Sequence, residues 1–469
     1  MNASDRRIAV GLFIIAFVTY AWFFGGGGWN QNAQLDLTRA LVERQTLHID
    51  GYRVNTGDIS WSRVSGEWHA YINKPPGVSF LAAIPYAFLY AIEHALQVPV
   101  DSWKWVTINT WLITVMTCGV TGALIPVVLY LYGIRRASRL TALGVALAMA
   151  FGTIVFPYAT MLMAHVPAAL FLLLAFVWLD ERPLLAGICA GIAGVCFYIC
   201  IPAAIVMLID AFARSRRNAI RFALGGLPFG IFLGVYHYLC FGSPFRTAVE
   251  ASPNFTEEGL LFGVFYLPSR DALWGLTFSE YRGLFFVSPV LLLAFIGAFK
   301  MQRRERAMIG AIVAIFFLAI AGFNGWHGGW AFGPRYLLPI IPLVAIPMLY
   351  VRGRALAIAG IVLGVLSFGM QLLATSVHPM PSDAIRRPIR DHLLRIGHTS
   401  VNPQAMDELV PYRSYPRGSR ESTWASFNLG ELIFGAGNPW SVLPIALWVI
   451  GGAVILSRLD GAGSPAGST

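Results

Sequence analysis

The chain has 469 residues, of which 57% are apolar and only 12% are charged. A soluble globular protein carries about 25% charged residues, so this composition excludes a water-soluble enzyme and a disordered chain. The five cysteines all fall inside apolar runs and form no Cys-x-x-Cys pair. That pattern is typical of buried apolar side chains and not of a disulfide framework or a zinc site.

The apolar runs predict an all-α, polytopic membrane protein with about twelve transmembrane helices. A span needs about 20 mostly apolar residues. The run 184–213 contains Pro202 near its middle and predicts two short helices, whereas Val78–Ala91 has the length of an interfacial or re-entrant helix. The other candidate spans are Ile8–Phe24, Val106–Leu131, Leu140–Phe156, Met161–Leu179, Phe222–Phe241, Leu284–Phe299, Met308–Phe323, Tyr336–Tyr350, Ala355–Ala374 and Val442–Leu456.

The basic residues indicate the direction of these spans, because cytoplasmic loops are enriched in Lys and Arg. With the N-terminus inside, the inside segments hold 17 basic and 6 acidic residues, and the outside segments hold the remaining 17 basic and 18 acidic residues. If Val78–Ala91 crossed the membrane, Arg135, Arg136 and Arg139 would lie on the outer side, against this rule. The net charge of +10 therefore reports topology and not a nucleic-acid partner, and we expect both termini in the cytoplasm.

The long polar segments all fall on the outer side, at 25–105, 242–283, 324–335 and 375–439. This distribution favours an enzyme that works at the outer leaflet. The two halves show no internal repeat, which weakens the interpretation as a secondary transporter. We predict one transmembrane domain over residues 1–458 and a disordered tail, rich in Gly, Ser and Pro, over residues 459–469.

The first outer segment begins with an amphipathic pattern. The run Asn30–Asn32 can cap a helix that extends to about Leu47. Its apolar residues share one stripe, while Asp36 and Arg39 lie on another face. This pattern predicts a helix on the membrane surface that presents Asp36 to the water side. An exposed ion pair between Asp36 and Arg39 fits the same spacing.

Two basic residues lie at the expected depth of the lipid headgroups. Lys74 precedes Pro75, Pro76 and the predicted interfacial helix, and Arg335 directly precedes a span. Either cation can bind a lipid phosphate, or it can serve as an ordinary membrane anchor. His165 and His237 lie within apolar runs, where a lone histidine is most often a hydrogen-bonded core residue.

Aromatic side chains surround a glycine pair in the outer segment 324–335. Trp326, His327 and Trp330 flank Gly328 and Gly329, which permit a tight turn. Aromatic faces suit sugar rings, and tryptophans at this depth are also typical of the interfacial aromatic belt.

In their order along the chain, these segments resemble the GT-C superfamily of membrane glycosyltransferases. The nearest branches are the bacterial protein-mannosyltransferase-like group and the lipid A aminoarabinose transferases. The shared layout is one span, an outer loop with a juxtamembrane helix, then Lys-Pro-Pro-Gly before a second such helix, and a span that ends in Arg-Arg. The segments Asn324–Tyr336, Ser426–Glu431 and Pro439–Ser441 are also similar to uncharacterised bacterial members.

The resemblance implies a GT-C-like bundle in the bacterial cytoplasmic (inner) membrane. It implies a glycosyltransferase that moves a sugar from a polyprenyl-phosphate-linked donor to a cell-envelope acceptor, which is a glycolipid, a polysaccharide or a protein, with inversion at the anomeric carbon. The implied partners are this donor, this acceptor and membrane lipids. No cofactor is implied, and metal dependence is left open.

Family members place an acidic residue directly after the first span as the general base. This chain has Asn30 and Gln31 there, and amides are not bases. The resemblance therefore implies Asp36 as the base, with Asp58 as the alternative, and Lys74 and Arg335 as ligands of the donor phosphate. The residues implied in sugar or acceptor binding are Arg39, Tyr71, Trp326, His327 and Trp330.

Two other functions fit the composition. A transporter or flippase of lipid-linked saccharides would place charged residues near the middle of the membrane, whereas this chain keeps its charges at the ends of the spans. A lipid-saccharide binding protein without catalysis is favoured by the amides at residues 30 and 31.

Overall fold

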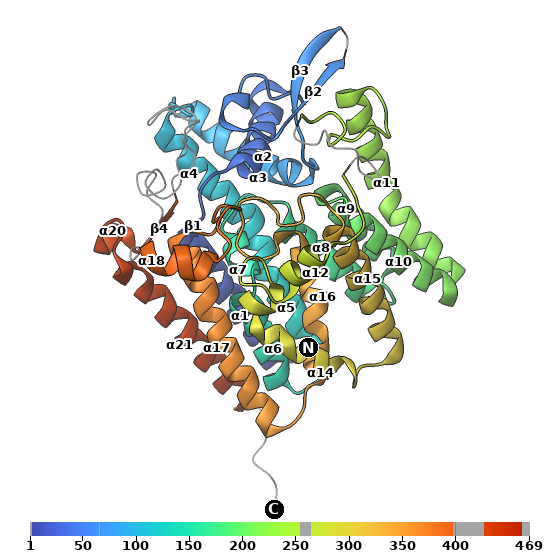
Figure 1. Ribbon diagram of the computed structural model, residues 1–469, viewed down its shortest axis with the longest axis vertical. Coiled ribbons are helices and arrows are strands. Elements are labelled where there is room, and N and C mark those ends of the chain that lie inside the picture. The colour runs from blue at the N-terminus through green and yellow to red at the C-terminus, as the bar shows by residue number, and fades with distance from the viewer. Residues whose placement is uncertain (1, 65, 254–263, 397–398, 400–425, 462–469) are drawn as a thin grey trace, which may run out of the picture.

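The computed structural model describes residues 2–64, 66–253, 264–396, 399 and 426–461. Within these ranges the chain is mainly helical, as the sequence predicts (Figure 1). The longer helices are α1 (Ala3–Trp22), α3 (Gly77–Ala95), α4 (Trp103–Thr114), α5 (Val120–Gly133), α6 (Arg139–Phe151), α8 (His165–Trp178), α9 (Pro183–Cys196), α10 (Cys200–Arg214), α11 (Arg216–Phe241), α15 (Arg303–Ala321), α17 (Arg354–Val377) and α21 (Leu443–Gly461).

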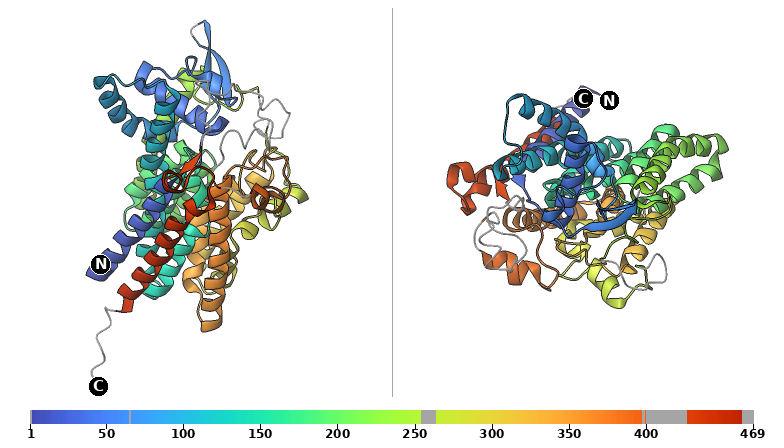
Figure 2. Two further views of the ribbon diagram at one scale, coloured as in Figure 1. Left: turned by 90° about the vertical axis from the view of Figure 1, so that its left-hand side faces the viewer. Right: turned by 90° about the horizontal axis from the view of Figure 1, so that it is seen from above.

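Shorter elements connect these helices, and the segments 29–39 and 59–72 lie at the end of the molecule opposite the start of α1 and the end of α21 (Figures 1 and 2). The short helices are α2 (Trp29–Arg39), α7 (Val155–Ala159), α12 (Arg270–Thr277), α13 (Leu284–Val287), α14 (Leu293–Ala298), α16 (Ile341–Ala345), α18 (Leu394–Ile396) and α20 (Glu431–Phe434). The strands are β1 (Phe23–Phe24), β2 (Ile59–Val64), β3 (Glu67–Ile72) and β4 (Phe427–Asn428).

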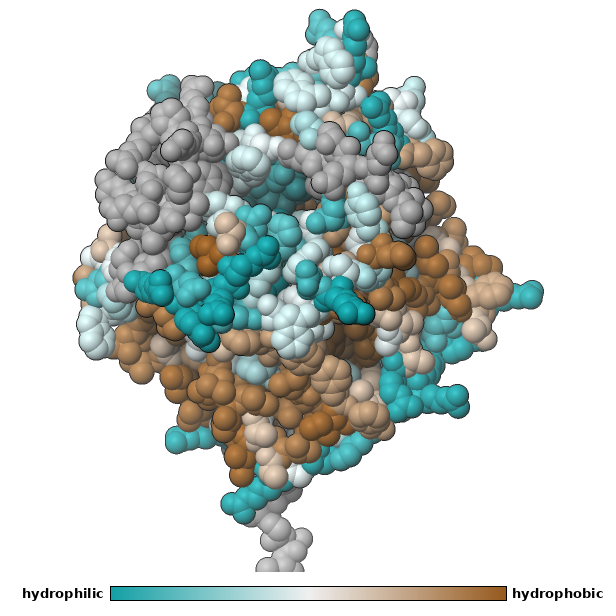
Figure 3. All heavy atoms as spheres, in the orientation of Figure 1, coloured by the Kyte–Doolittle hydropathy of each residue, from teal (hydrophilic) through white to brown (hydrophobic). Residues whose placement is uncertain are grey.

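Five helical segments in the described residues are long and apolar enough to cross a membrane: Gly77–Ala95, Lys104–Gly133, Arg216–Phe241, Arg354–Val377 and Pro439–Leu459. Apolar side chains form a broad belt below the polar end, with a narrow polar rim beneath it (Figure 3). Both observations support a membrane protein.

One predicted helix is longer than the sequence indicates. The expected 78–91 helix extends over Gly77–Ala95 and is apolar enough to cross a membrane. It continues through Glu93 because this side chain is buried and accepts a hydrogen bond from Asn109 Nδ2 at 3.0 Å. The run 184–213 forms two helices as predicted, α9 and α10, and Pro202 lies in the first turn of α10, where proline is tolerated.

The structure corrects the prediction for the first outer helix. α2 begins at Trp29, not after Asn32, and ends in a π-helical turn at Ala40–Arg44. Every side chain from Asn30 to Arg39 is buried. α2 packs against α3 and the 52–56 segment, so it is an internal element and does not lie on the membrane with one face in water.

A β-hairpin follows α2 and was not predicted. β2 and β3 are antiparallel and pair Ile59 with Ile72 and Val64 with Glu67. The alternation of apolar and polar residues in Ile59–Val64 is the sequence signal for this strand. A second pair, β1 with β4, joins the end of the first helix to the last outer segment through Phe24 and Phe427.

The ends of the helices opposite the hairpin are joined by ion pairs. Arg304 contacts Asp180 at 2.9 Å and Asp210 at 2.7 Å, and Arg214 contacts the same two acids. The basic residues of these loops therefore connect α10 and α15 to the end of α8. The predicted tail begins too early, because α21 extends to Gly461; residues 462–469 lie outside the described ranges.

α9 and α11 make the most extensive helix contact in the described structure because glycines let their backbones meet. A Cβ atom on Gly225 would lie 2.2 Å from the Leu184 carbonyl oxygen, whereas a Cβ on Gly230, one turn further along α11, would meet no atom within 4 Å. Small residues at such positions are typical of close helix pairs in membranes.

We expect Gly225→Ala to lower the thermal unfolding midpoint of the detergent-purified protein. The added methyl group must separate the two helices, at a cost of about 1–3 kcal/mol. Gly230→Ala is the matched control on the same helix, where alanine gains about 1 kcal/mol of helix propensity without a clash. Equal midpoints for the two variants would contradict this packing.

Candidate functional site

Two of the predicted site residues form an ion pair at the base of the hairpin. The Lys74 Nζ atom lies 3.2 Å from Asp58 Oδ2, and both side chains are largely buried. Asn73 holds Asp58 in place, because its N–H donates to the Asp58 carbonyl at 3.1 Å and its Nδ2 donates to Oδ1 at 3.3 Å. The pairing of Ile59 with Ile72 brings these two ends of the hairpin together.

Arg335 lies close to this pair, although the two are more than 250 residues apart in sequence. Its side chain is buried, its guanidinium lies 5.1 Å from the Tyr336 ring centroid, and its Nε has no hydrogen-bond partner in the described structure. The charge of Asp58 acts on Arg335, but within the described ranges no carboxylate lies within 4.0 Å of the guanidinium. Three of the four residues predicted as base or phosphate ligands thus share one region.

A second buried arginine, Arg282, supports the loop before Arg335. It donates to the carbonyls of His327 at 2.9 Å and Gly329 at 2.8 Å, and to its neighbour Tyr281 at 2.9 Å. Burial lowers the pKa of Arg282 to about 10, so it remains charged at neutral pH. From sequence, Arg282 could equally pair with Glu280, but Glu280 instead accepts a hydrogen bond from the Arg390 N–H at 3.1 Å.

His165 packs against the aromatic rings of Phe197 and Tyr336, which also contact each other, and it is 3% exposed. Neither ring nitrogen has a hydrogen-bond partner in the described structure, and the charges of Arg335 and Lys74 act on it. The expectation of a hydrogen-bonded core histidine is therefore wrong for His165. It holds for His237, whose Nε2 lies 2.9 Å from the Tyr198 hydroxyl.

We call Lys74, Arg282, Arg335, Asp58 and His165 the cation cluster. It contains three positive groups and one carboxylate, and two of its members have buried nitrogen atoms that form no hydrogen bond with any residue the structure describes. A buried charge or polar group is unfavourable unless it is paired. The cation cluster is therefore suited to bind an anion with several acceptor oxygens, such as a phosphate.

Asp36 on α2 is fully buried. Asn55 Nδ2 donates to Asp36 Oδ1 at 3.1 Å, and Oδ2 has no hydrogen-bond partner within the described ranges. Burial raises the pKa of Asp36 well above its ordinary value. Asp36 and Asp58 are both held by the neighbouring residues Asn55 and Thr56. Asn55 contacts Asp36, and the Asp58 N–H donates to the Thr56 hydroxyl at 3.1 Å. The prediction that Asp36 faces water is wrong.

Arg39 and Tyr71 belong to other clusters. Arg39 pairs with Glu43 and Asp101, both at 2.6 Å, so the predicted pair with Asp36 does not form. Tyr71 packs edge-on against Phe241 beneath the hairpin. Neither contact brings these two side chains to the cation cluster.

The aromatic residues of the 324–335 loop lie near Arg282. Trp326 packs edge-on against Tyr281 at 6.0 Å between ring centroids, and Trp330 packs against His378 at 6.5 Å. His327 Nδ1 accepts a hydrogen bond from the Gly329 N–H at 3.0 Å, and burial lowers its pKa. A Cβ atom on Gly328 would lie 3.1 Å from Arg335 Cγ, so this loop passes beside the Arg335 side chain.

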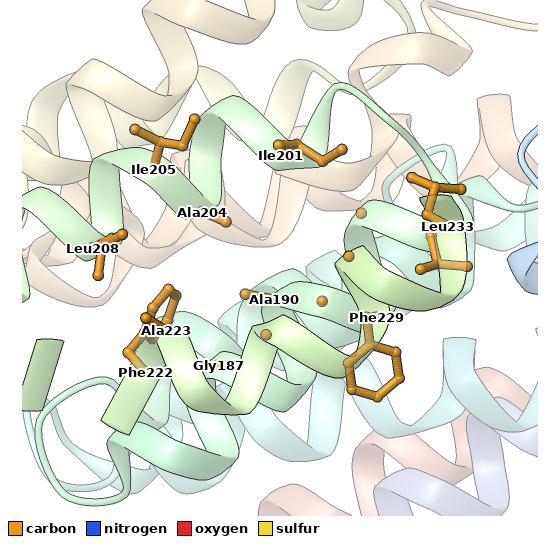
Figure 4. Close-up of a pocket in the computed structure, with 15 residues that line it drawn as sticks. Gly187, Ala190, Ile201, Ala204, Ile205, Leu208, Phe222, Ala223, Phe229 and Leu233 are labelled. Carbon is orange, nitrogen blue, oxygen red and sulfur yellow. The ribbon is translucent and has the colours of Figure 1, made fainter. Parts of the chain in front are cut away.

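An apolar groove of about 200 Å³ lies between α9, α10 and α11. Figure 4 shows Ile201, Ile205 and Leu208 of α10 facing Phe222 and other apolar side chains of α9 and α11. The remaining lining residues are Gly187, Ala190, Gly191, Gly194, Val195, Ala204, Ala223, Gly226, Phe229, Gly230 and Leu233.

One end of the groove adjoins the cation cluster. Val195 lines the groove, and a Cβ on Gly77 would lie 2.7 Å from the Val195 carbonyl carbon and 2.6 Å from the Cys196 nitrogen. Gly77 follows Lys74 by three residues. At the same end of α9, Phe197 contacts both His165 and Tyr336. The glycine of Lys-Pro-Pro-Gly is thus required where α3 meets α9.

Comparisons with protein-family models, curated proteins and solved structures find no match to this chain.

Replacing Asp36 by Asn is expected to stabilise the folded protein increasingly as pH rises. The raised pKa means that the folded chain holds this proton more tightly than the unfolded chain, so raising the pH destabilises the wild type by at most ~1.4 kcal/mol per pH unit. Asparagine carries no titrating proton. Unfolding midpoints from pH 5 to pH 8 should therefore diverge between Asp36→Asn and the wild type.

The control is Asp271→Asn, which changes an exposed acid on α12 and should follow the wild type at every pH. A constant difference between Asp36→Asn and the wild type would show that Asp36 is not a buried titrating group.

Proposed function

We propose that this protein is a glycosyltransferase of the outer membrane leaflet, which moves a sugar from a polyprenyl-phosphate carrier to a cell-envelope acceptor. One observation carries the proposal: an apolar groove between membrane helices adjoins a buried cluster of cations that has a carboxylate beside it. A polyprenyl-phosphate sugar has a matching sequence of chemical groups, namely an apolar chain, a phosphate and a sugar.

The phosphate end is supported by the charges of the cation cluster. Lys74 and Arg335 would bind the phosphate oxygens, and His165 would offer an N–H donor. Negative charge grows on the phosphate as the sugar leaves, and fixed cations in a water-poor site stabilise this charge strongly. In the described part of the chain, Arg335 Nε and both ring nitrogens of His165 are buried and have no hydrogen-bond partner.

The reaction assigned to this site is a direct displacement. An acceptor hydroxyl would attack the anomeric carbon, the bond from that carbon to the phosphate oxygen would break, and the hydroxyl proton would pass to a carboxylate. The products are the glycosylated acceptor, with inverted configuration, and polyprenyl phosphate. Trp326, His327 and Trp330 are positioned on the 324–335 loop to contact the sugar or the acceptor.

Asp58 is our choice for the carboxylate, although the sequence resemblance ranks Asp36 first. Asp58 lies with Lys74 in the cation cluster and retains some exposure, whereas Asp36 is fully buried and bonded to Asn55. A general base must come within hydrogen-bond reach of the proton it accepts, and only Asp58 meets this requirement without movement of α2. Asp36 would then act through Asn55 on the segment that holds Asp58.

We further propose twelve crossings with both termini on the cytoplasmic side of a bacterial inner membrane. All twelve sequence-predicted spans coincide with helical segments, and the shorter apolar ones would cross at sites where neighbouring helices cover them. α3 would stay at the outer surface as a juxtamembrane helix with α2.

Asp58→Asn should reduce the release of polyprenyl phosphate by about 10²–10⁴-fold. The assay uses detergent-purified protein, a panel of polyprenyl-phosphate sugars and an extract of envelope lipids as acceptor. Asp271→Asn is the control and should release polyprenyl phosphate at the wild-type rate.

The other arms of this assay separate the alternatives. Loss of activity in Asp36→Asn with full activity in Asp58→Asn would move the base to Asp36. Binding of the donor without release in every condition would favour a binding protein, and movement of intact donor across a vesicle membrane would favour a flippase.

Filling the groove should weaken the binding of long carriers selectively. Ala204→Trp places an indole in the groove, and we expect the KM for a donor with a long isoprenoid chain to rise ~10-fold or more. The KM for a donor with a very short chain should stay unchanged. Ile209→Trp is the matched control on the same helix, because residue 209 is exposed and does not line the groove. An equal rise in KM for both donors would assign the groove no role in carrier binding.

A further inference from the structure

A second polar cluster lies at the outer end of the protein, apart from the cation cluster. It joins the segment after the π-helical turn to strand β3 and contains His48, Asp50 and His69. One ligand atom from each residue lies within 4.8 Å of the other two. Asp50 Oδ2 is 2.7 Å from His69 Nδ1 and 3.1 Å from His48 Nδ1.

The two rings converge on the same carboxylate oxygen. The imidazoles of His48 and His69 are stacked, with 4.5 Å between their centroids and 25° between their planes. Only His69 is aligned for a hydrogen bond to Asp50; His48 Nδ1 is a buried atom without a hydrogen-bond partner in the described structure. His48 Nδ1 and Asp50 Oδ2 thus lie 3.1 Å apart without sharing a hydrogen bond. Two atoms that bind the same metal ion have this arrangement.

Backbone hydrogen bonds hold the three residues in this arrangement. The Ile49 N–H donates to the Ala70 carbonyl at 2.8 Å, and the Ala70 N–H donates to Asp50 Oδ1 at 2.7 Å. The first oxygen of Asp50 is therefore occupied, and Oδ2 is directed to the histidines.

We propose that His48, Asp50 and His69 bind a divalent transition-metal ion, for which Zn²⁺ is the best match. Two imidazoles and one carboxylate suit Zn²⁺, whereas Mg²⁺ and Ca²⁺ prefer sites made only of oxygen atoms. Zinc bonds of about 2.0–2.1 Å place tetrahedral ligand atoms ~3.3 Å apart. The contacts of 2.7 Å and 3.1 Å would therefore lengthen by about 0.6 Å and about 0.2 Å, and the stacked rings would turn toward the ion. Three protein ligands leave a fourth position for water.

Glu67 completes the surroundings of the site. Its Oε2 lies 4.0 Å from His69 Nε2, the nitrogen that faces away from Asp50. A metal-binding histidine commonly directs its second nitrogen to a carboxylate, which orients the ring and strengthens the ligand. The bound ion would join residues 48–50 to β3, and β3 ends two residues before Lys74.

The test measures metal binding, so it does not depend on the proposed glycosyltransferase activity. Full-length protein in detergent is treated with EDTA and then dialysed against buffered Zn²⁺, and the zinc retained per chain is measured by elemental analysis. We expect one Zn²⁺ per wild-type chain. His48→Gln and His69→Gln should each weaken zinc affinity by at least ~100-fold, since even residues that only orient a ligand contribute 10–100-fold.

His94→Gln is the matched control, because His94 is exposed on α3 and lies outside this cluster. It should retain wild-type affinity. If one of the two variants His48→Gln and His69→Gln fails to fold, the zinc affinity of the other decides the test. In addition, Zn²⁺ should raise the unfolding midpoint of the wild type but not that of the folded variant. Less than one zinc per wild-type chain, or zinc retained equally by a folded His48→Gln or His69→Gln protein, would overturn the proposal.

Discussion

An excess of buried positive charge at the hairpin end of the helices is the constraint on which this architecture depends. Lys74 pairs with Asp58, the charge of Asp58 also acts on Arg335, and Asp383 is the carboxylate that acts on Arg282. Burial of a charge is tolerated when hydrogen bonds or opposite charges compensate it. Arg282 is compensated by three carbonyl oxygens and Lys74 by Asp58. Among the residues that the structure describes, only the ring and hydroxyl of Tyr336 compensate Arg335, and this imbalance is the strongest physical indication of an anionic ligand.

The surrounding elements supply the contacts that allow Lys74, Arg282 and Arg335 to be buried. Arg282 holds the 324–335 loop by its carbonyls, and that loop passes beside Arg335. On the opposite side, the hairpin brings Asp58 to Lys74. A glycine at residue 77 lets α3 approach the backbone of α9 at Val195 and Cys196, so the start of α3, just after Lys74, lies against the end of α9 that lines the apolar groove. Carrier chain and phosphate would then bind to adjacent parts of one protein surface.

Strand β3 connects the two polar clusters. His69 contributes to the candidate metal site, and Asn73 and Lys74, just beyond the strand, contribute to the cation cluster. A metal ion at His48, Asp50 and His69 would restrict the motion of β3 relative to α2. The strand would therefore present Lys74 from a fixed position, although the metal itself would lie outside the cation cluster.

The sequence by itself determined the class of protein and the sites of most helices, because apolar runs must be buried in lipid or in a core wherever they occur. It also pointed to Lys74, Asp58 and Arg335 as candidates, and the structure places these three residues in one region. It did not predict that Asp36 is internal, since amphipathic spacing shows which side of a helix is apolar and not whether another element covers the polar side.

Only the tertiary structure decided which polar residues meet. Arg335 and Asp58 are far apart in sequence, His165 resembles any core histidine until both its nitrogens are seen without partners, and Arg39 could pair with Asp36 or with Glu43. His48, Asp50 and His69 have no motif spacing. Their convergence depends on the antiparallel pairing of β2 with β3 and on the hydrogen bonds of Ile49 and Asp50 to Ala70, which are long-range contacts that local sequence patterns do not encode.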